Sequence, residues 1–180
     1  MDSEIVLIEP SYDYAQQIED YIAEFPDVRP RVTYIEARIP GTDYLESYSS
    51  VRDWLSFCDS MRGKISWYLA IRLSDNRLIG CSCLRHRLEY DDDDYDFASH
   101  IGYSIRPSER RKGYGTAQLK LLLLKAKEHG LESVRIVCAD TNTASNRTVL
   151  ACGGVYIDSI YGSESGLTIN RYDVTTPYSV

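Results

Sequence analysis

Apolar residues recur at every second position in seven stretches of the chain, and this alternation predicts β-strands. The first stretch places Ile5 and Leu7 on one face of a strand. The predicted strands span residues 4–9, 65–73, 77–88, 99–106, 133–139, 155–160 and 167–174. The tight turn Ser74-Asp75-Asn76 predicts that the second and third strands form a hairpin, and the last two strands are expected to form another.

Apolar residues that recur at every third or fourth position predict four amphipathic helices. The predicted helices span residues 12–25, 43–59, 116–129 and 143–152. The side chains expected to face inward from the first two are Tyr14, Ile18, Tyr21, Ile22 and Phe25, then Leu45, Tyr48, Val51, Leu55 and Cys58. Strands and helices interspersed in this way predict an α/β (α+β) fold.

The chain is long enough and apolar enough to form one core. It has 180 residues, of which 43% are hydrophobic, so we expect a single domain over residues 1–180. No apolar run approaches the ~20 residues that a membrane span requires. The first residues, Met1-Asp2-Ser3-Glu4, are acidic, unlike the positive start of a secretory signal. The expected location is cytoplasmic, with no membrane partner.

Charge is distributed unevenly along the chain. The net charge is −7, and residues 1–60 carry thirteen acidic and four basic side chains, a balance of −9. Residues 101–130 carry two acidic and seven basic side chains, a balance of +5. The basic segment suits an anionic ligand, and the acidic segment can attract a cationic substrate. The overall balance disfavours nucleic acid as a partner.

Five cysteines leave one over from any complete disulfide pairing. Cys81 and Cys83 are expected to point to opposite faces of a strand, which suits neither a zinc site nor a disulfide between them. We therefore expect no metal site, and buried thiols in a reducing compartment.

The segment from His100 to Thr116 combines a strand, a basic glycine turn and the start of a helix. Pro107 ends the strand because proline donates no ladder hydrogen bond. The turn Arg110-Arg111-Lys112-Gly113-Tyr114-Gly115 begins three residues after Pro107. Glycines let a ligand approach the backbone closely, and the positive end of the helix dipole favours negative charge. This turn is predicted to bind a pyrophosphate.

Spacing separates three known kinds of phosphate-binding turn. A Walker loop requires Gly-Lys-Ser/Thr, but here Lys112 precedes Gly113. A dinucleotide fingerprint requires a third glycine three residues after Gly115, where this chain has Gln118. The third kind fits, because Arg110-x-x-Gly113-x-Gly115 matches a Gln/Arg-x-x-Gly-x-Gly/Ala signature.

This signature resembles that of the GNAT superfamily of acyl-CoA-dependent N-acyltransferases. A second segment, Asn142-Thr-Ala-Ser145 before a helix that runs to Gly153-Gly154, resembles the family's Asn-x-x-Ala/Ser signature. The matched region spans 78 to about 160. The resemblance implies a central twisted mixed sheet of about seven strands flanked by about four helices, with the fourth and fifth strands splayed apart.

The resemblance also implies acetyl-CoA as co-substrate, without a metal. Its pantetheine arm would pair with the fourth strand, and an N–H of that strand would face the oxyanion. The residues expected to bind it are Tyr103, Ser104, Ile105, Arg110, Arg111, Lys112, Gly113, Tyr114, Gly115, Thr116, Asn142 and Ser145. The implied activity is transfer of an acetyl group to a primary amine by direct attack in a ternary complex.

An amine must lose a proton before it can attack a thioester, so the site needs a general base. Many relatives place a glutamate at the start of the fourth strand, where this chain has His100, the candidate general base. Asp96 and Glu89 are the next candidates, and His86 is a weaker one that core or surface packing explains better.

The family's usual acid for the leaving thiolate is absent. A tyrosine is expected seven residues after Asn142, but that position is Val149. Ser145, Tyr156 or water can supply the proton instead, and Ser145, which belongs to the second signature, is the candidate catalytic residue. A CoA thiol has a pKa close to that of cysteine, so the thiolate can also leave without a general acid.

The acceptor site is expected in the first two helices and the loop before the fourth strand. These segments contain Glu36, Asp43, Glu46, Asp91, Asp92, Asp93, Asp94, Tyr34, Tyr44, Tyr48 and Tyr90. Carboxylates with aromatic rings suit a cation, which favours a small amine, a basic side chain or an N-terminus as acceptor. Two other functions stay open: a non-catalytic acyl-CoA sensor or regulatory domain, and a module that binds a protein partner. The resemblance is also compatible with a homodimer.

Overall fold

The computed structural model describes residues 4–25, 39–88, 98–162 and 166–177, and these contain seven strands and four α-helices in the predicted order. The elements are β1 (Ile5–Ile8), α1 (Ala15–Ala23), α2 (Val51–Ser60), β2 (Ile65–Arg72), β3 (Arg77–Arg85), β4 (Ile101–Ile105), α3 (Tyr114–Glu128), β5 (Ser133–Ala139), α4 (Thr143–Ala151), β6 (Val155–Gly162) and β7 (Leu167–Thr175). The predicted fold class is confirmed.

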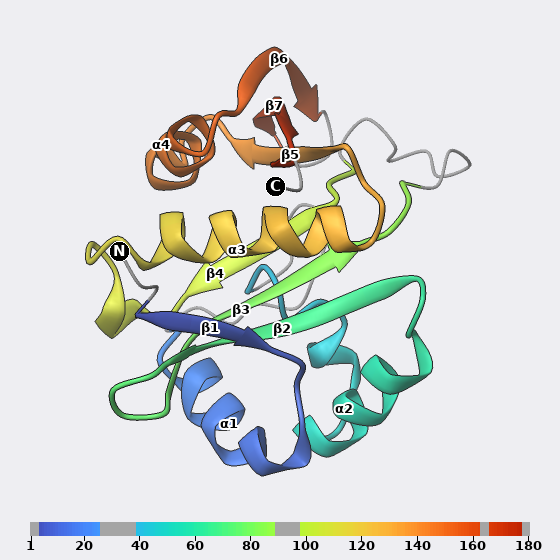
Figure 1. Cartoon of the computed structure of the whole chain (residues 1–180), viewed down its shortest axis with the longest axis vertical. Helices are drawn as coiled ribbons and strands as arrows, with labels where there is room; N and C mark the ends of the chain where they lie inside the picture. Colours follow the sequence, from blue (N-terminus) through green and yellow to red (C-terminus); the bar gives the residue numbers. More distant parts are fainter. Residues whose placement is uncertain (1–3, 26–38, 89–97, 163–165, 178–180) are drawn as a thin grey trace.

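The strands form two antiparallel hydrogen-bonded sheets, in the orders β1-β2-β3-β4 and β5-β7-β6. In the first sheet Gly80 lies opposite Ile105, and in the second Val134 lies opposite Val174. The crossover helix α3 joins β4 to β5, the edge strands at which the two sheets meet (Figure 1). The division of the strands at β4 and β5 matches the predicted splaying of the fourth and fifth strands.

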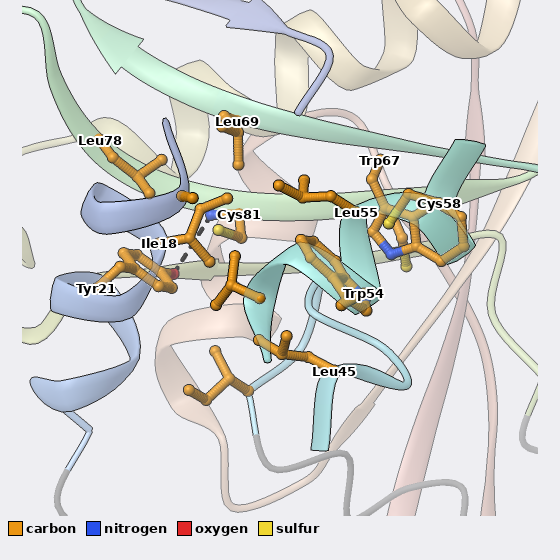
Figure 2. Packing of buried hydrophobic residues seen from close by; sticks show 14 of the residues in the cluster. Ile18, Tyr21, Leu45, Trp54, Leu55, Cys58, Trp67, Leu69, Leu78 and Cys81 are labelled. Atoms are coloured by element: carbon orange, nitrogen blue, oxygen red, sulfur yellow. Dashed lines mark hydrogen bonds between the residues drawn. The ribbon is translucent and has the colours of Figure 1, made fainter. Parts of the chain in front are cut away.

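Helices cover both faces of the first sheet. Helices α1 and α2 lie on one face and α3 lies on the other, between the first sheet and the second (Figure 1). Under α1 and α2, the fully buried Tyr21 and Trp54 belong to one core cluster with Trp67 of β2, and the ring of Trp54 packs against that of Trp67 (Figure 2). On the other side, Leu119 and Leu122 of α3 are fully buried in a core shared with β5 and β7.

The sequence-based prediction starts the second helix too early. A short 3₁₀ turn at Leu45–Ser47 comes first, and α2 begins only after Ser50. The Ser50 hydroxyl accepts a hydrogen bond from the backbone N–H of Asp53 at 3.1 Å, which is the capping arrangement that starts a helix. Because the helix begins at Val51, Trp54 points inward as well, which the prediction missed.

Other boundaries differ by one to three residues from the prediction. Residues Tyr12–Tyr14 form a 3₁₀ turn before α1, and β3 ends at Arg85 rather than at residue 88. Helix α3 begins at Tyr114, two residues earlier than predicted, because Gly113 adopts the left-handed conformation that serves as its N-cap. Such differences are ordinary where hydrogen bonding frays at the ends of elements.

The predicted orientation of two cysteines was wrong. Cys81 and Cys83 are both buried in the core beneath α1 and α2, because residues two positions apart on a strand share a face. All five cysteines are free thiols. Within the described ranges, no group of three or more metal-ligating side chains comes together, and no helix has the length and apolarity to cross a membrane.

Candidate functional site

A cleft opens where β4 and β5 diverge. At its narrow end the backbone N–H of His100 donates to the carbonyl oxygen of Arg135 at 2.8 Å, and beyond this contact the two strands share no ladder. The cleft has a volume of about 700 Å³. Its walls are β4, β5, the turn before α3 and the first turns of α4. The chain thus has a channel between its two sheets that is open to an extended ligand.

One edge of β4 is available to that ligand. The N–H of Arg106 donates to the carbonyl of Ile79 in β3, at 2.9 Å. Because backbone groups alternate in direction along a strand, Ser104 is paired to β3 while the N–H and C=O groups of Tyr103 and Ile105 face the cleft. Two of the three β4 residues predicted to bind the co-substrate therefore present backbone groups to it.

The basic turn leaves a run of backbone donors unused. No N–H from Arg111 to Thr116 donates to an acceptor among the described residues, and the first helical hydrogen bond after this turn runs from the N–H of Ala117 to the carbonyl of Gly113. Arg111 and Gly113 have positive φ angles of 66° and 87°. Consecutive N–H groups at a helix start form a concave anion site, so the geometry fits the predicted pyrophosphate.

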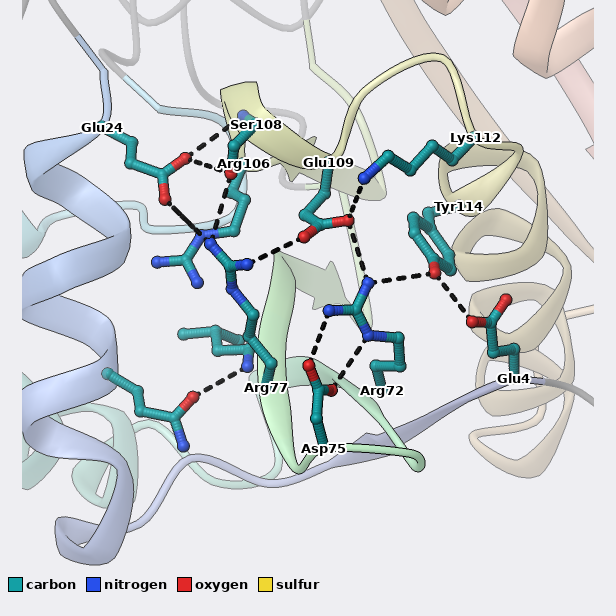
Figure 3. Close-up of polar contacts among 12 residues, drawn as sticks. Glu4, Glu24, Arg72, Asp75, Arg77, Arg106, Ser108, Glu109, Lys112 and Tyr114 are labelled. Carbon is teal, nitrogen blue, oxygen red and sulfur yellow. Dashed lines mark hydrogen bonds and ion pairs between the residues drawn. The ribbon is translucent and has the colours of Figure 1, made fainter.

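A buried carboxylate holds the base of this turn. Glu109 is 3% exposed and accepts from Arg72 at 3.0 Å, Arg77 at 3.0 Å and Lys112 at 2.8 Å (Figure 3). The hydrogen bonds from Lys112 and Arg72 lower the pKa of Glu109. Lys112, predicted to contact the co-substrate, thus has its ammonium group tied to Glu109. Sequence analysis did not identify this anchoring role of Glu109.

Gly115 faces the cleft directly. A Cβ added there would lie 3.7 Å from Thr148 Oγ1 and 3.9 Å from Ile105 Cγ1, which belong to opposite walls. Arg110 lines the same part of the cleft, and its Nε donates to the Ile105 carbonyl at 3.1 Å. The Tyr114 hydroxyl instead donates to Glu4, 3.0 Å away.

Two hydroxyl groups meet inside the cleft. Asn142 caps α4 by accepting from the N–H of Ser145 at 3.1 Å, which sets the position of that serine. The Ser145 hydroxyl then lies 3.1 Å from the hydroxyl of Tyr103, which reaches across from β4. Burial raises the pKa of Tyr103 to about 12, so its hydroxyl keeps its proton at neutral pH.

The match to known proteins is clear at the level of the family. Residues 13–155 match the family model described as Acetyltransferase (GNAT) domain, which is more than half of the chain. The chain belongs to the GNAT acetyltransferases. Among curated proteins, none matches it.

Solved GNAT structures share this fold. The ribosomal L7/L12 α-N-protein acetyltransferase RimL, in complex with coenzyme A, has a TM-score of 0.70 at 16% identity, over 97% of this chain and 95% of that one. A chimera of the Vibrio cholerae spermidine N-acetyltransferase SpeG and hSSAT has 0.67 at 13%, over 97% and 96%. The microcin C7 self-immunity acetyltransferase MccE, in complex with acetyl-CoA and AMP, has 0.67 at 19%, over 97% and 93%. At these identities the likeness concerns the fold, and the acceptors named for these proteins differ.

This GNAT chain departs from the family's pattern where the acid is expected. Val149 is fully buried in the core under α4, so no titratable group occupies that position. Tyr156, the alternative, is 52% exposed on β6 and bonded to Ser159, outside the cleft lining. Of the candidate proton donors named from the sequence, the structure brings Ser145 into the cleft.

His100 does not line the cleft of this GNAT domain. Its Nδ1 accepts the backbone N–H of Arg135 at 2.9 Å, so the proton of the neutral ring is on Nε2. Burial, with the nearby Arg135 guanidinium, lowers the pKa of His100 to about 4. The histidine therefore joins β4 to β5, and its geometry does not support the role of general base.

This contact predicts a pH-dependent stability. The pKa of His100 is about 4 in the fold and 6.5 ordinarily, so between these values the unfolded chain binds a proton that the folded chain does not. Stability is then full above pH 6.5 and falls by about 2 kcal/mol toward pH 4, allowing for partial solvent exposure. Urea unfolding of the wild type and of His100→Asn, whose amide oxygen can replace Nδ1 as acceptor, measures it. An equal decline in both proteins would contradict the assignment.

The remaining sequence-based candidates lie elsewhere. The ring of His86 stacks on that of His129 at 4.0 Å and bonds to Ser66, away from the cleft. The base candidates Glu89 and Asp96 lie outside the described residues, as do several residues expected in the acceptor site: Tyr34, Glu36, Tyr90, Asp91, Asp92, Asp93 and Asp94. Asp43, by contrast, lines the cleft together with Arg85, which sequence analysis did not single out.

Proposed function

We propose that this protein is an N-acetyltransferase that moves the acetyl group of acetyl-CoA to a primary amine. The observation that carries the proposal is the continuity of the cleft with two sets of backbone donors that have no partner among the described residues. One set is the N–H groups of residues 111–116, and the other is the outward edge of β4. An extended thioester with a diphosphate at one end requires this combination.

Backbone groups would hold most of the co-substrate. The N–H groups from Arg111 to Thr116 bind the diphosphate, helped by the dipole of α3. The pantetheine arm pairs with the cleft-facing edge of β4 at Tyr103 and Ile105, and Asn142 and Ser145 close the other wall. Gly115 leaves the space that the diphosphate needs.

The reaction is a direct acyl transfer. The neutral amine nitrogen attacks the thioester carbonyl carbon, forming the C–N bond, and the C–S bond then breaks to release the thiolate of CoA. The N–H of Tyr103 or Ile105 faces the cleft and can stabilise the oxyanion of the tetrahedral intermediate. Holding both reactants in one cleft supplies a further part of the rate enhancement.

The leaving thiolate can take its proton from the hydroxyl pair. Ser145 Oγ donates to the sulfur and is itself 3.1 Å from the Tyr103 hydroxyl, so the pair offers a donor where Val149 cannot. A CoA thiol is comparable in acidity to cysteine, so protonation of the leaving thiolate contributes less to the rate than removal of the amine proton does.

An amine panel tests the proposal. Acetyl-CoA is incubated with the protein and with small amines, polyamines, lysine derivatives and peptides that have unblocked N-termini, while thiol release is monitored. We expect release of CoA with at least one positively charged primary amine, and thermal protection by CoA of about 2.7 kcal/mol at a hundredfold its Kd. Protection without thiol release for any amine would favour the acyl-CoA sensor. If the protein shows neither thermal protection by CoA nor release of thiol, CoA binding is refuted.

A further inference from the structure

We propose that Asp43 is the carboxylate that binds the acceptor's ammonium group and takes its proton. This inference rests on the proposed N-acetyltransferase function, and it assigns the acceptor side of the same cleft. It also narrows the acceptor to a primary amine that is positively charged before reaction.

The choice follows from which acids line the cleft. Among the described residues in its walls, the carboxylates are those of Asp43 and Glu109, and no histidine is present. Glu109 is already paired with Arg72, Arg77 and Lys112 at the base of the phosphate turn. Asp43 lies at the opposite end of β4, beside Gly102.

The loop before α2 places Asp43 rigidly. Gly41, with φ of 91°, packs so closely on β3 that a Cβ there would lie 2.5 Å from the Cys81 carbonyl oxygen. The indole N–H of the fully buried Trp54 donates to the backbone carbonyl of Asp43 at 3.0 Å. These two contacts, one on each side of the loop, fix the position of the aspartate relative to the sheet.

The two carboxylate oxygens of Asp43 have different surroundings. The side chain is 3% exposed, and Oδ2 accepts from the guanidinium of Arg85 and from the thiol of Cys83 at 3.1 Å. No described residue donates a hydrogen bond to Oδ1, which lies 4.0 Å from the position of a Cβ added at Gly102. Arg85 and Cys83 therefore act as positioning residues, and Oδ1 remains to accept from a substrate.

Asp43 lies on the face of β4 from which an amine can approach the thioester. Side chains alternate along β4, so Gly102 and Ser104 face α1 and the loop at residues 39–44, while Tyr103 faces Ser145 on α4. The thioester would run along the edge between these two faces. An amine at Asp43 thus approaches from one face, and the Ser145 hydroxyl serves the thiolate from the other.

The chemistry needs a carboxylate at this point. A lysine-type amine with a pKa near ~10.4 is almost entirely protonated at pH 7, and a buried anion attracts that charge strongly. The bound ammonium first gives one proton to Asp43 Oδ1, directly or through a water molecule, and Asp43 passes it to solvent, which leaves a neutral nitrogen whose lone pair forms the C–N bond. The second N–H proton leaves the nitrogen by the same route after this bond has formed, while the departing thiolate is protonated separately to give the CoA thiol. Arg85 balances the charge of the aspartate before the acceptor arrives.

The test compares acceptors that differ in charge. In Asp43→Asn, kcat/KM should fall at least about 100-fold for a lysine-type amine, which is typical of losing a general base. The loss should shrink to under about 10-fold for hydroxylamine or an arylamine, which are uncharged at the assay pH and need no carboxylate to bind them. CoA affinity, measured by calorimetry on the same protein, should stay within about twofold because Asp43 lies away from the phosphate turn.

Two companion variants protect the test against loss of folding. Asp43→Asn leaves Arg85 without its anion, so the double variant Asp43→Asn/Arg85→Gln, which neutralises the whole pair, is expected to fold and to show the same losses. Asp158→Asn removes an aspartate–arginine pair on β6 and β7, outside the cleft, and should leave kcat/KM unchanged.

The outcomes separate the two proposals. Equal losses for charged and uncharged amines in both Asp43 variants, or a loss below about threefold for the lysine-type amine, would overturn the role of Asp43. In both cases wild-type turnover would leave the N-acetyltransferase function intact. A wild-type protein that binds CoA but acetylates no amine would instead overturn the function, and the role of Asp43 with it.

Discussion

Replacement of Gly115 by glutamate should abolish CoA binding. The Cβ of residue 115 would point between Thr148 and Ile105, so a longer acidic side chain enters the space assigned to the diphosphate. Its negative charge would also oppose the ligand's charge at the N-terminus of α3. We expect the affinity to fall by at least about 100-fold, or about 2.7 kcal/mol, in isothermal titration with CoA.

Gly115→Ala is the matched control for that experiment. Its Cβ makes only ordinary van der Waals contacts, and the φ angle of Gly115 is not in the positive region, so neither strain nor a clash is expected. Binding should therefore weaken far less than with glutamate. Undiminished CoA affinity in Gly115→Glu would show that the ligand does not use this turn, and the co-substrate assignment would fail.

Local sequence patterns were sufficient for most of the fold. The element order and the limits of β5, residues 133–139, were predicted because alternation and turn residues act within a few positions. The second helix was extended too far toward its N-terminus because residues 43–50 contain apolar side chains at helical spacing. The helix starts only after residue 50 because Ser50 caps its N-terminus and the loop before it docks on β3, and docking depends on residues far away in sequence.

The candidate site also has one part that local sequence predicts and one part that it does not. The phosphate turn is one continuous segment, so its glycines and basic residues could be recognised from spacing alone. The acceptor side is assembled from separate elements: Asp43 precedes α2, Arg85 ends β3 and Gly102 lies in β4. No spacing rule connects these three positions.

His100 illustrates the limit of transferring a role by position. It stands at the start of the predicted fourth strand, where relatives carry a base, and its ordinary pKa suits the task. In the fold its Nδ1 is used to join β4 to β5 through the N–H of Arg135. A ring nitrogen that satisfies a backbone donor is unavailable for proton transfer, and only the three-dimensional contacts reveal this.

The loop that carries Asp43 leads to the second large effect, which we expect from Gly41→Ala. A Cβ at this position would lie 2.5 Å from the Cys81 carbonyl oxygen and 2.6 Å from the Ser82 Cα, both of which are backbone atoms that cannot rotate away. The φ angle of 91° adds strain for any residue with a side chain. Together, the clash and the strain should cost about 3–4 kcal/mol in urea unfolding.

Gly63→Ala separates the two causes, because Gly63 has a similar φ of 87° but no atom within 4 Å of the added Cβ. It should lose only the backbone contribution, about 1–2 kcal/mol. In folded Gly41→Ala the loop must lift from β3 and carry Asp43 away from Gly102, so kcat/KM for a charged amine should fall while CoA affinity is retained. Equal destabilisation of the two variants would mean that the loop does not pack on β3 as described, and the acceptor side would then lack the support on which Asp43 depends.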